Sequence, residues 1–183
     1  MTTPASGSVP DLRFPIGKLE RKSSLTSAER TAALDAMAKA PAELRAAVKG
    51  LDDTQLDTPY RPDGWTVRQL VHHVADSHMN AYTRFRLALT EDAPTIKPYD
   101  EKSWAELPDV RELPVEHSLG ILDAMHARLD HLLRKTEPAS FARTLVHPEN
   151  GPMTMDSLLS IYSWHGRHHV AHVRGLRERM GWT

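Results

Sequence analysis

The chain has 183 residues, a formal net charge of -1 at pH 7 and no cysteine. This length is typical of one domain with a sizeable core, and the scattered, balanced charge argues against a surface that binds nucleic acid or an acidic membrane. The absence of cysteine excludes disulfides, thiolate metal ligands and a cysteine nucleophile, and it fits a cytoplasmic protein. The apolar runs are too short to cross a bilayer, and the N-terminus lacks the pattern of a secretory signal.

The first segment, residues 1–24, contains prolines and glycines and shows no hydrophobic periodicity. We therefore expect an extended N-terminal arm, followed by one helical domain over residues 25–183. The first helix is predicted to begin at Thr26, because Thr26 and Glu29 have the spacing of a capping box. It should run to Gly50, a residue suited to the end of a helix, and Pro41 is expected to kink it or split it in two.

Three further helices follow a turn-rich connector at residues 51–64. The second should open at Thr66, where Gln69 completes another capping box, and should run to about Glu91. The third is predicted over residues 115–136. The fourth should begin after Thr154 and end near Arg179, where several arginines suit a helix C-terminus.

Four amphipathic helices in a chain of this size predict an all-α fold, a four-helix bundle. The segment 93–114, between the second and third helices, is rich in proline and too long for a tight hairpin. It suits a crossover that leaves these two helices parallel, which gives an up-down-down-up order. Long connections often carry function. Because a loop of this length that contains a tryptophan usually packs on something, we expect this one, with Tyr99, Asp100, Glu101 and Trp104, to form a lid over the pocket.

The fourth helix carries four of the eleven histidines in the chain, at positions 165, 168, 169 and 172. On a helix they fall within a sector about 100° wide, which is also the apolar face. Burying four imidazoles is costly unless something binds them, and imidazole is the commonest metal ligand of proteins. The spacing offers two ligand pairs, His165 with His169 and His168 with His172. The first pair lies closer to the apolar stripe and is preferred, while the second remains an alternative.

A third ligand is expected from the second helix, because two ligands make a weak site. His73 lies at the edge of its apolar face, with Asp76 and Asn80 beside it, whereas His72 should be exposed and His78 should lie in the core. Three histidines leave an open position for water or substrate. Asp76 is then a candidate base or orienting group, and Asn80 a candidate substrate ligand. We expect ordinary surface or core positions for the remaining histidines, His117, His126, His131 and His147.

Several runs of the sequence resemble the YfiT-like metal-dependent hydrolases of the DinB superfamily. They are Phe14–Gly17, Leu56–Asn80, Lys97–Trp104, Trp164–His165, His168–His172 and Arg179–Trp182. The resemblance spans nearly the whole chain beyond the arm. It implies an up-down-down-up bundle, commonly a homodimer, in which three histidines hold zinc or nickel. Carried over by position, those ligands are His73, His165 and His169.

The resemblance also implies an activity. The expected function is a hydrolase in which one divalent ion, zinc before nickel, activates water against a small-molecule substrate. The alternative is a thiol S-transferase of the bacillithiol type, which joins a low-molecular-weight thiol to small electrophiles. A third hypothesis is a metal-binding stress-response module without catalysis.

Overall fold

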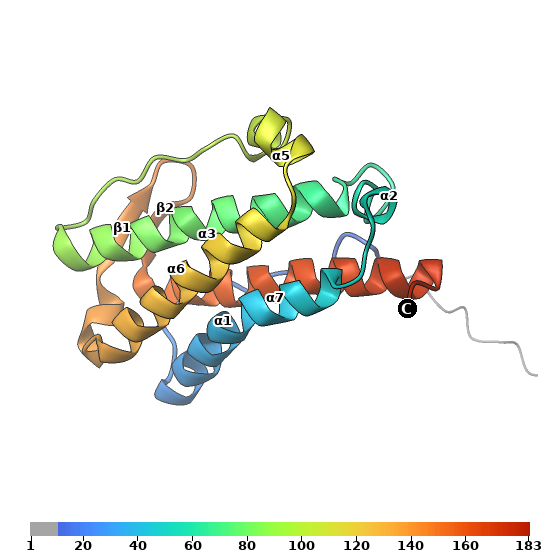
Figure 1. The fold of residues 1–183 in the computed structure, drawn as a ribbon. Helices are drawn as coiled ribbons and strands as arrows, with labels where there is room; N and C mark the ends of the chain where they lie inside the picture. Colours follow the sequence, from blue (N-terminus) through green and yellow to red (C-terminus); the bar gives the residue numbers. More distant parts are fainter. Residues whose placement is uncertain (1–10) are drawn as a thin grey trace, which may run out of the picture.

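The computed structural model describes residues 11–183, which form a bundle of four long helices (Figure 1). The long helices are α1 (Ser27–Val48), α3 (Val67–Thr90), α6 (Glu116–Lys135) and α7 (Met155–Met180). The connections contain the short helices α2 (Asp53–Leu56), α4 (Glu101–Trp104) and α5 (Pro108–Glu112), the 3-10 helix η1 (Pro138–Ala142), and the strands β1 (Thr144–His147) and β2 (Gly151–Thr154). None of the helices in this part of the chain is long and apolar enough to cross a membrane.

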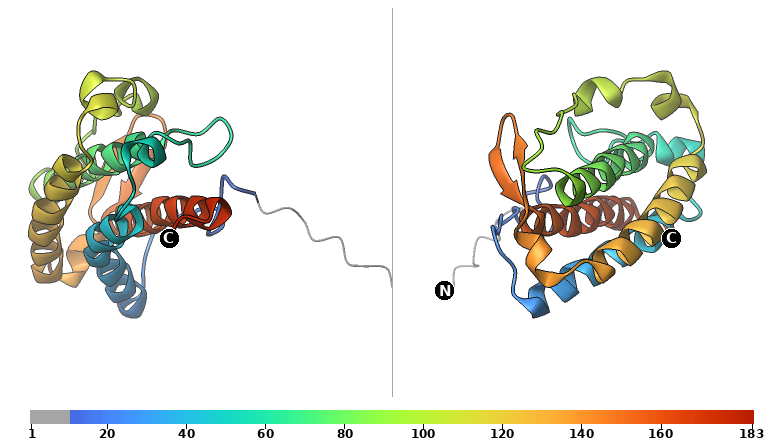
Figure 2. Two further views of the ribbon diagram at one scale, coloured as in Figure 1. Left: turned by 45° about the vertical axis from the view of Figure 1, so that its right-hand side comes forward. Right: turned by 90° about the vertical axis from the view of Figure 1, so that its left-hand side faces the viewer.

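The four long helices have the predicted up-down-down-up order. α1 and α7 run in one direction, and α3 and α6 run together in the other (Figures 1 and 2). Side-chain contacts agree with this order: Arg30 near the start of α1 binds Asp156 at the start of α7, and His72 near the start of α3 contacts Ser118 near the start of α6. The segment between α3 and α6 is therefore the expected crossover, since it returns the chain to the end from which α3 began.

Local sequence signals set the ends of the helices. Capping boxes form at Thr26 with Glu29 and at Thr66 with Gln69, as predicted. In each, the threonine hydroxyl accepts a hydrogen bond from a backbone N–H that has no partner within the helix. Gly50 follows α1 with a φ of 79°, a left-handed conformation that glycine adopts without steric cost.

Pro41 lies inside α1, which continues through it without a break. Of the two predicted outcomes, a kink or a split, the split is therefore wrong. Proline has no N–H, so the carbonyl of Met37, four residues earlier, loses its usual helical partner. In the folded protein this carbonyl accepts a hydrogen bond from Nδ1 of His126, at 2.9 Å. A side chain of a neighbouring helix thus replaces the missing backbone donor.

The hydrophobic core consists of two clusters, one toward each end of the bundle. The first includes Leu44, Val71, Leu122 and Val173, and the second includes Phe85, Leu129, Leu145 and Leu158. In sequence, His78, His126 and His165 fall between the members of the two clusters on α3, α6 and α7. The middle of the bundle therefore contains a layer of imidazoles between two apolar regions.

The crossover is hydrogen-bonded to the rest of the fold at its start and near its middle. At its start, it pairs with β1 through the N–H of Ile96, 3.0 Å from the carbonyl of Val146, and through the N–H of Val146, 2.9 Å from the carbonyl of Pro94. Further along, the side-chain amide of Gln69 on α3 donates to the carbonyl of Ala105, at 2.8 Å. Figure 2 shows α4 and α5 lying over the face of α3 that points away from α7. The crossover is therefore an ordered layer of the fold.

The β-hairpin of β1 and β2 was not predicted from the sequence. Its strands have only four residues each, which is too short for a clear alternating pattern. Leu145 and Met153 stand opposite each other in the hairpin, and both are buried in the core. The hairpin thus closes the end of the bundle at which α7 begins.

The described part of the predicted arm lies along α7. The hydroxyls of Thr154 and Ser157, at the start of α7, donate to the carbonyls of Ser23 and Lys22, respectively. Residues 1–10 of the arm lie outside the described residues, so the division of the chain at residue 25 stays a prediction.

Candidate metal centre

Three histidine side chains converge in the middle of the bundle. His73 comes from α3, and His165 and His169 come from successive turns of α7. The Nε2 atom of His165 lies 3.2 Å from Nε2 of His73 and 3.2 Å from Nε2 of His169. Two nitrogen ligands at the usual distance from a tetrahedral zinc ion are about 3.3 Å apart. The three residues singled out by the sequence therefore form one group with the spacing of metal ligands.

The environment keeps these imidazoles neutral. His73 and His169 are almost fully buried. Burial lowers the pKa of His73 to about 4 and lowers the pKa values of His165 and His169 well below the ordinary value. A neutral ring has a free lone pair, which is the form that binds a metal ion. The three Nε2 atoms also face one another, an arrangement that a shared cation satisfies better than hydrogen bonds do, since a neutral ring has a single N–H.

The alternative pair, His168 and His172, is separate from this group. Their Nε2 atoms are 3.0 Å apart. The ring of His168 stacks on Trp164, with centroids 4.2 Å apart, and that of His172 lies against Tyr60 at 4.4 Å. Burial lowers the pKa of His168 to about 4 and that of His172 to about 3. Within residues 11–183, the group of three donors takes its α7 members from His165 and His169, the preferred pair.

The prediction that His72 is exposed is wrong. Its exposed fraction is 5%, and its Nδ1 and Nε2 atoms lie 2.7 Å from Oγ of Ser118 and 3.2 Å from the carbonyl of Leu113. The crossover packs over the face of α3 that carries His72 and supplies that carbonyl. His78 lies in the core, as expected, with an exposed fraction of 1%.

The two candidate catalytic residues lie further along α3 than His73. Asp76, one turn on, is partly buried, and burial together with the nearby Asp109 raises its pKa to about 6. The side-chain amide of Asn80 donates to the backbone carbonyl of Asp76, at 2.9 Å. No hydrogen bond among residues 11–183 joins either side chain to the three histidines, so both catalytic roles remain predictions.

A pocket of about 490 Å³ opens beside the histidines. One wall comes from the loop before α3, including Arg61 and Trp65, and the other from the crossover, including Glu101 and Lys102. The ring of Trp65 packs on that of His73, with centroids 4.7 Å apart, and so connects the pocket to the metal-ligand group. The volume is in the range of small-molecule sites. No pattern in the sequence marks Trp65 as a pocket residue beyond its place before the helix cap.

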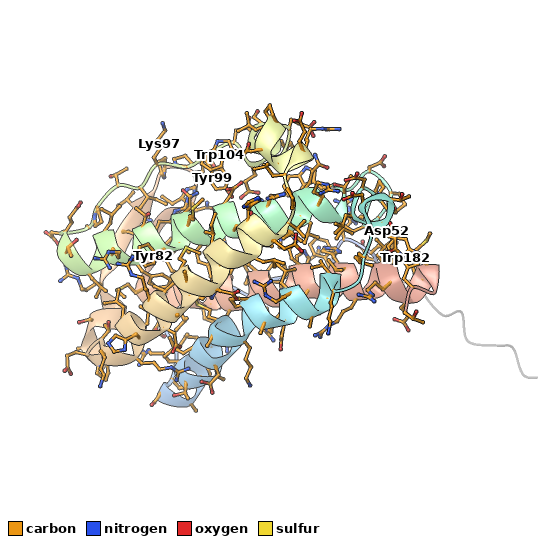
Figure 3. All side chains as sticks on the ribbon, viewed as in Figure 1. Asp52, Tyr82, Lys97, Tyr99, Trp104 and Trp182 are labelled. Carbon is orange, nitrogen blue, oxygen red and sulfur yellow. The ribbon has the colours of Figure 1, made fainter. Side chains whose placement is uncertain are left out.

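The crossover forms a wall of this pocket, and its role as a lid stays a prediction. The rings of Tyr99 and Trp104 pack together, with centroids 4.5 Å apart. Figure 3 shows both side chains on the crossover beside α3. Burial raises the pKa of the Glu101 carboxyl, which lines the pocket although it remains accessible to solvent. The crossover thus contributes charged side chains to the wall of the pocket.

Comparison with known proteins agrees with the fold, and the relatives are named as metal-dependent hydrolases. The chain is 52% identical over 172 residues to a protein of Bacillus mycoides (strain KBAB4) named "Putative metal-dependent hydrolase", covering 94% of this chain and 99% of that protein. It is 51% identical, with the same coverage, to a Bacillus cereus (strain B4264) protein of the same name.

Two solved structures share the bundle. YfiT from Bacillus subtilis, described as a probable metal-dependent hydrolase with an unusual four-helix bundle topology, is 44% identical, with a TM-score of 0.91 over 94% of this chain and 99% of that one. TT2238, a four-helix bundle protein, is 25% identical, with a TM-score of 0.53 over 77% of this chain and 94% of that one. The sequence profile of the DinB superfamily matches residues 36–173, and the chain therefore belongs to the DinB superfamily.

Proposed function

We propose that this protein is a metal-dependent hydrolase that holds one divalent ion between His73, His165 and His169. The observation that carries the proposal is the convergence of three neutral Nε2 atoms with the spacing of metal ligands, on two buried histidines and one partly buried histidine. The relatives from Bacillus mycoides and Bacillus cereus, named as metal-dependent hydrolases, support it.

The composition of the site favours a catalytic over a structural ion. The group contains three donors among the described residues, whereas structural zinc sites have four protein ligands. A divalent ion bound there supplies Lewis acidity, which lowers the pKa of a water to about 7 and that of a thiol to a similar degree. Neutral imidazoles in tetrahedral spacing suit zinc, with nickel as the second choice.

The pocket supplies the groups that select and hold a substrate. Arg61 and Lys102 place positive charge on the two walls, and Glu101 adds a carboxyl to the wall formed by the crossover. Charged groups of both signs around a cavity of this size fit a small polar molecule. We further propose that the protein acts as a homodimer in the cytoplasm.

Asp76 is the proposed base or orienting group, and its raised pKa gives a test. Replacing Asp76 with asparagine should lower turnover by about 100-fold or more, the range of a lost general base, while the ion is retained. A carboxyl whose pKa is raised on folding stabilises the fold below its unfolded value and loses that contribution as the pH rises through about 6. The thermal midpoint of Asp76→Asn should therefore exceed that of the wild type at pH 8 and approach it at pH 5. Unchanged turnover with these stability shifts would leave Asp76 outside the mechanism.

Thiol transfer is the second candidate, and the pocket gives a reason to consider it. A volume of about 490 Å³ with both signs of charge exceeds what a water nucleophile needs and suits a zwitterionic thiol. The protein has no cysteine of its own, so a thiol would enter as a cosubstrate. The third hypothesis, a metal-binding module without catalysis, requires a site closed by a further protein ligand.

One experiment separates these functions. Tag-free protein is analysed for metal, reconstituted with zinc or nickel, and assayed on activated esters and on small electrophiles, each with and without an added thiol. Hydrolysis that needs the ion and no thiol supports the hydrolase, whereas turnover that appears only with the thiol supports the transferase. About one tightly bound ion with no turnover under any condition supports the module. Failure to bind either ion would overturn the proposal as a whole.

A further inference from the structure

A chain of three histidine contacts connects the metal-ligand group to the backbone of α1. It begins at the carbonyl of Met37, which lies 2.9 Å from Nδ1 of His126. Nε2 of His126 is 2.8 Å from Nδ1 of His78, and Nε2 of His78 is 3.1 Å from Nδ1 of His165. Nε2 of His165, the last ring of this chain of contacts, lies 3.2 Å from the Nε2 atoms of His73 and His169. Each of the four long helices contributes one member of this chain of contacts.

The direction of the hydrogen bonds follows from elementary chemistry. A neutral imidazole has one N–H and one lone pair, and a carbonyl oxygen only accepts. His126 must therefore donate from Nδ1 to Met37, which leaves its Nε2 as an acceptor for Nδ1–H of His78. Nε2 of His78 is then the acceptor for Nδ1–H of His165. This order leaves the lone pair of His165 on Nε2, the atom that faces the other two ligands.

The starting carbonyl is available because of Pro41. The residue four positions after Met37 normally donates to that carbonyl, and proline has no N–H with which to do so. The order also requires the rings to be neutral, and burial lowers the pKa values of His78, His126 and His165. His78 and His126 are 1% and 3% exposed, and within residues 11–183 neither ring hydrogen-bonds to a carboxylate.

We infer that the Met37 carbonyl, His126 and His78 form a relay of hydrogen bonds that fixes His165 as the Nδ1–H tautomer and so aims its Nε2 lone pair at the ion. His78 and His126 are thus positioning residues of the metal site, although neither is a ligand. This inference rests on the proposed ion at His165. A free histidine side chain in water prefers the opposite tautomer, with the proton on Nε2, which would block the ligand atom. The relay reverses that preference before the ion arrives.

The geometry around the relay leaves little freedom for other arrangements. The rings of His78 and His126 stack, with centroids 4.9 Å apart and planes 23° apart, and Tyr162 packs edge-on against His78 at 5.5 Å. Gly166 brings α1 and α7 close, since a Cβ atom there would lie 2.9 Å from Cβ of Ala40. Ligand-binding histidines generally donate their second N–H to a fixed acceptor, and loss of that acceptor weakens metal binding by about 10- to 100-fold.

The test combines a tautomer measurement with metal affinity. In metal-free protein labelled with ¹⁵N-histidine, long-range ¹H–¹⁵N correlation spectra should show the wild-type His165 protonated on Nδ1. His78→Leu removes the acceptor and should shift His165 toward the Nε2–H form, with a Kd for Zn²⁺ or Co²⁺ weakened by about 10- to 100-fold. His78→Gln retains an acceptor oxygen and should restore both the tautomer and most of the affinity.

Two further variants show whether the effect passes along the relay. His126→Phe keeps an aromatic ring, and it should also mix the tautomers of His165 and weaken binding, although residue 126 does not touch that ring. His131→Phe, at an exposed position on the same helix, is the matched control. It should change neither the tautomer of His165 nor the affinity for the metal ion. Circular dichroism and thermal melts establish that each variant is folded.

The outcomes separate this inference from the proposed function. Wild-type His165 protonated on Nε2, or affinity and tautomer unchanged in both folded His78→Leu and His126→Phe, would overturn the relay while leaving a metal-binding hydrolase intact. A wild type with the Nδ1–H tautomer that binds no ion would overturn the proposed function instead. The wild-type spectrum decides the central point even where a variant does not fold.

Discussion

Replacing His165 with alanine is expected to abolish metal binding. The variant removes the ligand whose Nε2 atom lies 3.2 Å from the Nε2 atoms of both His73 and His169, and so removes the centre of the group. The loss should exceed the 10- to 100-fold effect of a partner outside the ligand set. Elemental analysis should fall from about one ion per chain to near zero, and any metal-dependent turnover should disappear with it.

The control for this variant is the second histidine pair on the same helix. His172→Ala removes a histidine that is about as buried as His169, yet it should keep the ion, because His172 contacts His168 and Tyr60 instead. Metal retained in His165→Ala but lost in His172→Ala would assign the ion to the other pair. The far-ultraviolet circular dichroism of both variants should remain helical, which shows that metal loss does not reflect unfolding.

Replacing Asp156 with alanine should destabilise the fold more than any other single ionic substitution. Both oxygens of Asp156 bind the Arg30 guanidinium at 2.9 Å, and one also accepts from the N–H of Leu25 at 2.9 Å. The side chains are 5% and 17% exposed, so the variant leaves a mostly buried charge without its partner. Removing one partner of a buried ion pair lowers the free energy of unfolding by about 3–5 kcal/mol. In a chain of this length, the melting temperature should fall by roughly 6–20 °C.

An exposed ion pair provides the comparison. Asp130 binds Arg134 one turn away on α6, with side chains 30% and 39% exposed, and Asp130→Ala should change stability by about 1 kcal/mol or less. Replacing both Arg30 and Asp156 with apolar residues should recover much of the loss, since no unpaired charge remains. A melting temperature for Asp156→Ala equal to that of Asp130→Ala would show that the buried pair does not hold α1 to α7.

Much of the fold could be predicted because its signals are local. The capping boxes at Thr26 and Thr66 depend on residues three apart, and the observed helices begin where they predict. The length and proline content of the crossover favoured parallel helices, because the segment is too long for a tight hairpin. His73, His165 and His169 could be selected because helical spacing determines which side chains share a face.

The errors concern contacts between distant segments. His72 was expected to be exposed because it points away from the apolar stripe of its own helix, and the sequence does not reveal that the crossover covers that side. His126 has no partner spacing within its helix, and its partners, Met37 and His78, are 89 and 48 residues away. Pro41 was the available signal, since a proline inside a buried helix leaves a carbonyl that needs a donor from elsewhere. From the sequence alone, Pro41 indicates a kink or a break in α1 and does not identify the side chain that replaces its N–H.

The distribution of the three proposed ligands over the bundle has a consequence for the order of events during protein synthesis. His73 emerges from the ribosome 92 residues before His165, and α7 is the last of the four long helices to be made. Until α7 has docked, a nascent chain has one of the three ligands, so it cannot capture an ion at this site. An unstructured chain ranks divalent metals largely by their intrinsic affinity, with copper first. Because the proposed site is completed last, the ion is selected by the geometry of the folded bundle and not by the intrinsic affinities of the unfolded chain.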